Sequence, residues 1–154
     1  MITFKKQSNQ KPYIILRELY DLALKKHQPD IQAISIASYS ASENEVSTRY
    51  VNLKFIINDK FIFFSNYNSP KATAFNSHNQ IAALIYWSRI NVQIRMKAII
   101  KKTSNEYNQK YFFDRSKEKN ALAISSNQSK PIDSYSQVKK NYNKSLKNDD
   151  LKKC

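Results

Sequence analysis

Two short stretches in the middle of the chain combine the residue types that bind a phosphorylated ligand. The first, Arg49-Tyr50-Val51-Asn52-Leu53-Lys54, places two cations on one predicted strand. The second, Phe63 to Lys71, brings hydroxyls, amides and a lysine to a predicted strand-to-helix junction, where free backbone N–H groups and the helix dipole favour an anion. Arginine and lysine form charge-assisted hydrogen bonds with phosphate. The two stretches therefore predict an anion site.

The spacing of the two cations sets a condition on this site. Arg49 and Lys54 are five positions apart, an odd spacing, so a regular strand places them on opposite faces. If both bind one ligand, the strand must bend or end between them. The alternative is a solvated strand with two surface charges, which is the commoner situation for charged residues.

The composition favours an anionic partner and excludes several kinds of site. Lys and Arg number 26 against 12 Asp and Glu, giving a formal charge of +14. Glycine is absent, which removes both common glycine-rich nucleotide-binding loops, so side chains must hold any bound phosphate. The single cysteine, Cys154, allows no internal disulfide and no thiolate cluster for zinc. The sequence shows neither a membrane-spanning apolar run nor a signal peptide, so a cytoplasmic location is expected.

Hydrophobic periodicity predicts a mainly β domain with peripheral helices. Apolar residues at helical spacing indicate a helix from Pro12 to about Lys26, and Asn58-Asp59 is typical of a tight hairpin turn. Segments rich in β-branched and aromatic residues predict five strands, at 31–39, 46–57, 60–65, 80–88 and 91–102. On the last strand, an apolar face alternates with a face that carries Gln93 and two cations.

The predicted helices and short connections are consistent with one small barrel domain. A short helix is predicted to begin at Pro70, a helical pattern resumes beyond Thr103, and a last helix covers about 133–147 before a frayed basic tail. Five strands with short connections suggest a small antiparallel barrel. We therefore expect a single domain over residues 1–154 with a core at about 12–132.

At five segments the sequence resembles the pyridoxamine 5′-phosphate oxidase family. This family shares an R-x-V-x-L-K strand, an (F/Y)-(Y/F)-(T/S)-N-x-x-S-x-K segment, an R-Q-V-x-x-x-G strand, a Y-F-x-x-R segment and a Q-S pair. Here they correspond to residues 49–54, 63–71, 91–98, 110–115 and 128–129. The resemblance runs from about Pro12 to Ile132 and implies a split β-barrel that binds FMN as a homodimer, with the flavin at the subunit interface.

The resemblance also implies an activity and a set of ligand contacts. In this family, a hydride passes from the 4′ carbon of pyridoxamine or pyridoxine 5′-phosphate to the flavin, which oxygen reoxidises. The substrate contacts would be Lys54, Tyr111 and Arg115, with Lys119 where the family usually has a serine. No metal and no catalytic side chain is implied. The FMN contacts would be Arg49, Tyr50, Val51, Lys54, Phe64, Ser65, Lys71, Gln93, Gln128 and Ser129.

Departures from the family pattern keep two alternatives open. Pro70 stands where the family has a second cation, and the sequence has no counterpart of the W-G-G-x-R strand and R-x-H segment that follow in the family. A relative lacking the C-terminal segment that binds FMN or pyridoxal phosphate without turnover is therefore one alternative. The other is a basic barrel that binds nucleic acid through its aromatic residues. Against the latter, Phe61, Phe63 and Tyr86 are predicted to pack in the core and Trp87 to lie in the core or at a dimer interface, while His27 and His78 are expected at the surface.

Overall fold

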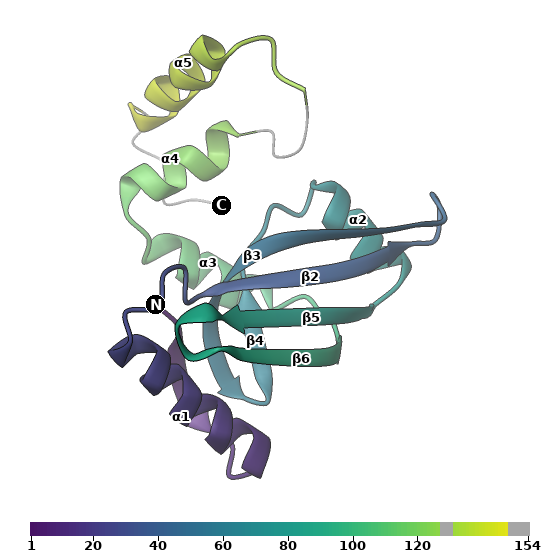
Figure 1. Cartoon of the computed structure of the whole chain (residues 1–154). Helices are drawn as coiled ribbons and strands as arrows, with labels where there is room; N and C mark the ends of the chain where they lie inside the picture. Colours follow the sequence, from purple (N-terminus) through teal and green to yellow (C-terminus); the bar gives the residue numbers. More distant parts are fainter. Residues whose placement is uncertain (127–130, 148–154) are drawn as a thin grey trace. The chain divides into compact units, whose positions relative to one another are not determined.

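The computed structural model describes residues 1–126 and 131–147, which group into two compact units (Figure 1). The first unit comprises Met1–Ser65 and Lys71–Ile100. The second comprises Asn66–Pro70 and the described residues from Lys101 onward. None of the helices in these described ranges is long and apolar enough to cross a membrane. That the whole chain is one domain stays a prediction.

A six-stranded sheet forms the first unit. Its strand order is β1-β3-β2-β5-β6, with β4 also paired to β3, and the sheet does not close on itself, as expected of a split barrel. All pairs are antiparallel except β1 with β3. The strands are β1 (Thr3–Gln7), β2 (Ala33–Ser40), β3 (Glu45–Asn58), β4 (Lys60–Phe63), β5 (Gln80–Trp87) and β6 (Val92–Ile99), with a 3-10 turn at Ser88–Ile90 between the last two.

The five predicted strands are confirmed, and β1 is an additional one. Its sequence, Thr-Phe-Lys-Lys-Gln, is mostly polar, and only Phe4 is partly buried. A strand held by backbone pairing with so little apolar alternation leaves no signal of period two. The hairpin turn at Asn58-Asp59 is confirmed, since Ile57 pairs with Lys60 across it and Asn58 has φ of 54°.

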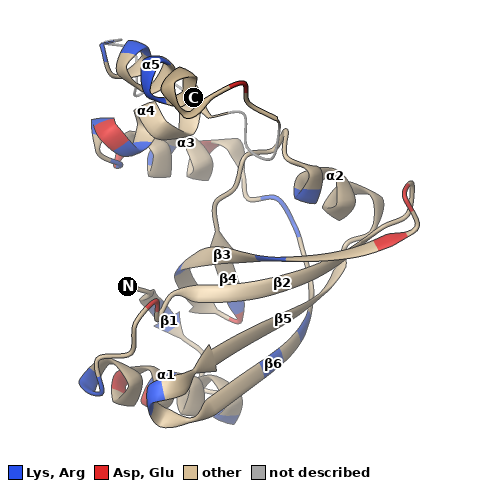
Figure 2. Cartoon of the chain, turned by 45° about the horizontal axis from the view of Figure 1, so that its top comes forward, with Lys and Arg blue, Asp and Glu red and all other residues tan. Residues whose placement is uncertain are grey.

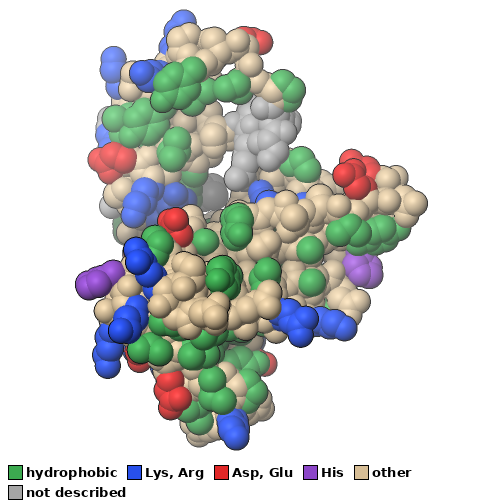
Figure 3. Space-filling model, in the orientation of Figure 1, with side chains coloured by type: hydrophobic (Ala, Val, Ile, Leu, Met, Phe, Trp, Pro, Cys, Tyr) green, Lys and Arg blue, Asp and Glu red, His purple; other side chains and the backbone are tan. Residues whose placement is uncertain are grey.

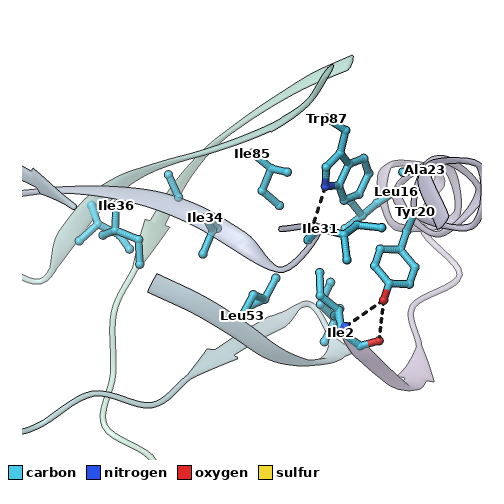
Figure 4. Packing of buried hydrophobic residues seen from close by; sticks show 13 residues of the cluster. Ile2, Leu16, Tyr20, Ala23, Ile31, Ile34, Ile36, Leu53, Ile85 and Trp87 are labelled. Carbon is cyan, nitrogen blue, oxygen red and sulfur yellow. Dashed lines mark hydrogen bonds between the residues drawn. The ribbon is translucent and has the colours of Figure 1, made fainter. Parts of the chain in front are cut away.

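Helix α1 (Lys11–Lys25) packs on one end of the sheet and completes the main core (Figure 4). Its buried residues are Leu16, Tyr20 and Ala23, which recur at the three- and four-residue spacing of one helix face. The Tyr20 hydroxyl accepts a hydrogen bond from the Ile2 amide (2.9 Å) and donates to the Ile2 carbonyl (3.3 Å). Trp87, only 1% exposed, donates from Nε1 to the Ile31 carbonyl (3.1 Å). Trp87 therefore belongs to the core, one of the two places predicted for it.

The absence of glycine leaves ordinary residues in left-handed backbone conformations. At the end of α1, the His27 amide donates to the Leu24 carbonyl and the Gln28 amide to the Ala23 carbonyl, both at 3.0 Å. This is a Schellman motif, in which the residue at the position of His27 is usually glycine because a Cβ is crowded there. His27 has φ of 52°.

Replacing His27 by glycine is therefore expected to raise the free energy of unfolding by about 1 kcal/mol. Removing the Cβ relieves the left-handed conformation and leaves both capping hydrogen bonds in place. Urea denaturation of the variant measures the change. Gln28→Gly is the matched control, because it adds the same flexibility one residue later and is expected to destabilise; equal effects of the two variants would contradict this reading.

Helix α2 (Pro70–Ser77) follows β4 and packs beside the β2–β3 hairpin. The rings of Phe63 and Phe75 meet edge to face at 6.3 Å, and the Ser77 hydroxyl accepts the Ala41 amide at 3.4 Å. Pro70 at the first helical position agrees with the sequence prediction. These contacts hold the second half of α2 against β4 and the turn of the β2–β3 hairpin.

Three helices make up most of the second unit: α3 (Asn105–Phe113), α4 (Lys117–Ser125) and α5 (Tyr135–Leu146). Each begins after a serine, Ser104, Ser116 or Ser134, whose hydroxyl accepts a backbone N–H of the first turn. The fully buried Asn120 donates from Nδ2 to the Phe112 carbonyl (2.8 Å) and so ties α4 to the end of α3. The helices α3 and α5 agree with the predicted helical segments, while α4 is additional.

Candidate anion-binding site

The first unit brings two cations together on the inner side of the β2–β3 hairpin. Lys71, in the first turn of α2, is only 7% exposed, and Arg49 of β3 is half-buried. Burial, together with the nearby charge of Arg49, lowers the pKa of Lys71, and burial lowers the pKa of Arg49. Two positive charges held close to each other in a partly desolvated place favour the binding of an anion between them.

Hydrogen bonds to neutral oxygens hold the Arg49 guanidinium in place. Its Nη1 donates to Ser38 Oγ at 2.7 Å and to the Ile36 carbonyl at 3.4 Å, and its Nη2 donates to Ser47 Oγ. Among the described residues, Arg49 has no carboxylate partner, so its charge is oriented but not neutralised. Sequence reasoning did not assign a role to Ser38 and Ser47; their alternation with apolar residues on adjoining strands is the signal that would have placed them beside Arg49.

Ser65 supplies an unsatisfied polar atom after the end of β4. Its Oγ is buried and has no hydrogen-bond partner among the described residues. Buried hydroxyls normally have a partner, and a bound ligand is one explanation for an exception. Ser65 lies in the segment that the sequence assigned to the anion site. A phosphate oxygen would satisfy this hydroxyl.

The condition on Lys54 is met by an irregularity in β3. Leu53 pairs with Phe63 and Phe55 pairs with Ile62, so Lys54 is an extra residue on β3 opposite β4. Such a bulge shifts the alternation of faces. Arg49 and Leu53 share the inward face before it, and counting back by two from the buried Ile56 places Lys54 on the inward face as well. Arg49 and Lys54 can therefore approach one ligand.

Two other predicted contacts lie on the opposite face of the same sheet. Tyr50, next to Arg49, is 76% exposed, and Gln93 of β6 is exposed as part of the polar face predicted from the sequence. In Figure 1 neither α1 nor α2 crosses the front of β2, β3, β5 and β6, and Figure 3 shows hydrophobic side chains scattered over this side of the unit. One small ligand in one copy of the chain cannot reach Arg49 and Gln93 through the sheet.

Of the remaining residues predicted for the same ligand, two lie in the first unit. Val51 faces inward and packs against the main core. Phe64 is half-buried, and its ring meets that of Phe55 edge to face at 6.3 Å. Gln128 and Ser129 lie outside the described residues.

Three predicted substrate contacts lie in the second unit, around the α3–α4 connection. Arg115 donates from Nη2 to the Lys119 carbonyl at 2.9 Å, and its guanidinium lies 5.9 Å from the centre of the Tyr111 ring. Burial raises the pKa of Tyr111, and the charge of Arg115 opposes that rise. Tyr111, Arg115 and Lys119 thus form one local group, with the Lys119 side chain exposed. A hollow of about 510 Å³ elsewhere in this unit, lined by Ser125, Asn141, Lys144, Ser145 and Lys147, contains none of the predicted residues.

One expectation about aromatic residues is wrong. Tyr86 was expected in the core, but it is 57% exposed, because β5 turns Ile85 and Trp87 inward and therefore Tyr86 outward. Phe61 and Phe63 do pack against the core, and His27 and His78 are exposed as expected. The described residues include no cluster of three or more potential metal ligands among His, Cys, Asp and Glu.

Curated proteins with related sequences are named pyridoxine/pyridoxamine 5′-phosphate oxidases. The chain is 32% identical over 121 residues to pyridoxine/pyridoxamine 5′-phosphate oxidase 1 of Hydrogenovibrio crunogenus, which covers 79% of this chain and 56% of the relative. It is 32% identical over 121 residues, with the same coverage, to the oxidase of a Nostoc species, and 28% identical over 131 residues to that of Bordetella pertussis, covering 85% of this chain and 62% of the relative. The chain thus spans a little over half the length of these relatives. No protein-family model matches it.

Solved structures share the fold. The structure of PhzG from Burkholderia lata, in complex with tetrahydrophenazine-1-carboxylic acid, has a TM-score of 0.78 at 21% identity and covers 88% of this chain and 66% of that one. A pyridoxamine 5′-phosphate oxidase-related, FMN-binding protein from Nostoc punctiforme has a TM-score of 0.63 at 14% identity, covering 80% and 70%. Together with the sequence identities, this common split-barrel architecture means that the chain belongs to the pyridoxamine 5′-phosphate oxidase family.

Proposed function

We propose that the cluster of Arg49, Ser65 and Lys71 binds the phosphate of FMN. The observation that carries the proposal is the pair of partly desolvated cations, Arg49 and Lys71, with the unsatisfied hydroxyl of Ser65 in the same predicted site. These groups fit a phosphate dianion, which accepts several hydrogen bonds and neutralises both charges. Lys54 at the bulge supplies a third cation. The FMN-binding relative of the same fold supports the choice of ligand.

The corresponding activity would be that of an FMN-dependent oxidase acting on a phosphorylated vitamin B6 compound. The bound flavin would supply the redox chemistry, taking a hydride from the 4′ carbon of pyridoxamine or pyridoxine 5′-phosphate and passing the electrons to oxygen. The chain's own part is to bind and orient. Tyr111, Arg115 and Lys119 would hold the substrate, with Arg115 attracting its phosphate and Tyr111 donating a hydrogen bond. The half-buried Tyr111 stays protonated at neutral pH, since burial raises its pKa.

We also propose that the functional form is a homodimer with the flavin at the subunit interface. The predicted FMN contacts lie on both faces of one sheet: Arg49 and Lys71 inward, Tyr50 and Gln93 outward. A second copy would complete the site if its own outward face packed over the inward side of the first copy, where Arg49 and Lys71 lie, and so brought its Gln93 to a flavin whose phosphate the first copy holds. The exposed Tyr50 and Tyr86, with the half-buried Leu84 between β2 and β6, give that face the aromatic and apolar character of an interface core. A cytoplasmic location agrees with this role and stays part of the proposal.

A titration with FMN, followed by flavin fluorescence and the visible spectrum, tests the binding proposal. We expect saturable binding that Arg49→Leu weakens by about 10-fold or more, because one charge-assisted hydrogen bond contributes about 1.5–3 kcal/mol. Arg17→Leu, which removes a cation at the surface of α1, serves as the control and should bind FMN normally. No saturable binding by the unaltered chain, or equal binding by the Arg49 and Arg17 variants, would contradict the proposal.

Turnover is a separate question from binding. Oxidation of pyridoxine 5′-phosphate by the FMN-loaded protein above a protein-free FMN control would establish the oxidase, and binding without turnover would support the non-catalytic alternative. A nucleic-acid role remains a second candidate, because the exposed Tyr50 and Tyr86 share a sheet face with Arg95 and Lys97. A labelled single-stranded oligonucleotide tests it, since such binding weakens steeply with added salt.

A further inference from the structure

A buried asparagine lies in helix α4 at a position where an aliphatic residue would serve the packing. Asn120 is 0% exposed, and so is the following residue, Ala121. Asparagine has a low helix propensity, and burying an amide costs free energy unless hydrogen bonds compensate for the lost water. A particular hydrogen bond is therefore a more specific reason for an amide here than packing is.

That hydrogen bond joins α4 to the end of the preceding helix. The Nδ2 atom of Asn120 donates to the Phe112 carbonyl at 2.8 Å, and the same carbonyl accepts the backbone amide of Arg115 at 3.3 Å. Carbonyls in the last turn of a helix have no partner within that helix. One acceptor thus ties the Asn120 side chain to the backbone of Arg115, within the short α3–α4 connection that Figure 1 shows.

The Arg115 side chain closes the same connection from the other side. Its Nη2 donates to the carbonyl of Lys119, the residue before Asn120, at 2.9 Å. Its guanidinium lies 5.6 Å from the centre of the Phe112 ring and 5.9 Å from that of the Tyr111 ring. Arg115 forms no ion pair with another described residue, so its charge can act on a ligand. The guanidinium is thus oriented by its neighbours and keeps its charge.

The surface around this connection carries charges that are not oriented in this way. Figure 2 shows both signs of charge in the first turn of α4, where Lys117, Glu118 and Lys119 are exposed. A flexible lysine loses side-chain entropy when it binds an anion, whereas a guanidinium that is already held loses less. Selectivity for a phosphate group at this place therefore depends on how firmly Arg115 is held.

We propose that Asn120 is a positioning residue that holds Arg115 in the orientation that binds the phosphate of the substrate. The inference rests on the proposed function, in which Arg115 and Tyr111 contact a phosphorylated vitamin B6 compound. Asn120 would not touch that compound, because its side chain is buried and donates to the Phe112 carbonyl. Without the amide, the α3–α4 connection would be free to move and the guanidinium would no longer be kept beside the Lys119 carbonyl.

Asn120→Leu tests the proposal, because leucine keeps an apolar side chain of similar size in the buried position and removes the donor. One probe is 4-deoxypyridoxine 5′-phosphate, which has a methyl group in place of the reacting 4′ alcohol. The other is 4-deoxypyridoxine, which lacks the phosphate. Calorimetric titration of the FMN-loaded chain gives the ratio of the two affinities, the phosphate preference. We expect Asn120→Leu to lower the phosphate preference by about 10-fold. Equal losses of affinity for both probes would overturn the proposal, since general structural damage has that effect.

A double-mutant cycle shows whether Asn120 acts through Arg115. Arg115→Met is expected to lower the phosphate preference by about 10-fold or more, and adding Asn120→Leu to it should change the ratio by less than about 2-fold. Asn108→Leu is the matched control, because it removes an asparagine in the first half of α3 whose Nδ2 donates to the Tyr67 hydroxyl at 3.0 Å. It should leave the ratio unchanged. Additive losses in the double variant, or an equal loss in Asn108→Leu, would overturn the positioning role.

A measurement without ligand separates this proposal from the proposed function. NMR of a chain isotope-labelled at the arginine nitrogens should resolve separate signals for the two Nη groups of Arg115, because the bond to the Lys119 carbonyl slows rotation of the guanidinium. The signals, assigned by their loss in Arg115→Met, are expected to merge in Asn120→Leu and to stay separate in Asn108→Leu. Unchanged signals in Asn120→Leu would overturn the positioning role. An unchanged phosphate preference in Arg115→Met would instead contradict the substrate contact itself, and the NMR signals then decide alone whether Asn120 holds Arg115.

Discussion

Replacing Lys71 by methionine is expected to weaken FMN binding by about 10- to 100-fold, corresponding to the loss of a charge-assisted hydrogen bond of about 1.5–3 kcal/mol. The same change removes the repulsion between Lys71 and Arg49, so it is expected to alter the free energy of unfolding of the ligand-free chain much less than it alters the free energy of FMN binding. Fluorescence titration and urea denaturation measure the two effects. A large loss of affinity without a matching loss of stability distinguishes a ligand-binding lysine from a structural one.

The pH dependence of FMN binding supplies the control for Lys71. Burial and Arg49 lower the pKa of Lys71 in the free chain, and a bound phosphate would raise it again by neutralising the repulsion. Binding then takes up a proton between the two pKa values, so affinity falls as the pH rises through the pKa of the free chain. The Lys71→Met variant lacks this dependence, and Lys71→Arg, which keeps its charge, should restore affinity and flatten the profile. A profile unchanged by Lys71→Met would remove this lysine from the site.

The sequence predicts the local elements well because each depends on neighbours along the chain. Alternation identified β2 to β6, helical spacing identified α1, and Asn58-Asp59 identified the hairpin. Alternation from the inward-facing Trp87 turns Tyr86 outward, so the aromatic character of Tyr86 is a poor guide to its burial. β1 could not be found in this way, since its position depends on pairing with β3 and hardly on its own apolar residues.

The candidate site depends on information that is only partly local. The sequence shows that Arg49 and Lys54 can share a ligand only if β3 is irregular, but the irregularity itself arises from how β4 pairs with β3. The approach of Lys71 to Arg49 depends on the packing of α2 beside the hairpin, which no spacing along the chain encodes. The family resemblance gave both cations as contacts of one ligand. It gave no indication that Tyr50 and Gln93 lie on the other face of the same sheet.

Because Lys71 and Gln93 lie on opposite faces of one sheet, mixing two variants that are each impaired in FMN binding is expected to restore part of the binding. If the Lys71 of one copy and the Gln93 of its partner contact the same flavin, Lys71→Met and Gln93→Ala homodimers each have two impaired sites. Random reassortment of equal amounts makes half of the dimers mixed, and each mixed dimer has one intact site. About one quarter of all sites should therefore regain the affinity of the unaltered chain.

The mixture also tests whether Gln93 contacts the flavin held by its own copy or the flavin held by the partner, because the two arrangements predict different fractions of recovered sites. The two variants are mixed under conditions that allow subunits to exchange, and the fraction of high-affinity sites is measured by FMN titration beside each variant treated alone. If Lys71 and Gln93 of one copy served the same flavin, every site in every dimer would keep one defect and the mixture would regain nothing. A chain that stays monomeric would also regain nothing, and sedimentation velocity separates that case from the first. Recovery near one quarter requires two copies that each complete the other's site, which follows from a sheet that holds phosphate ligands on one face and Gln93 on the other.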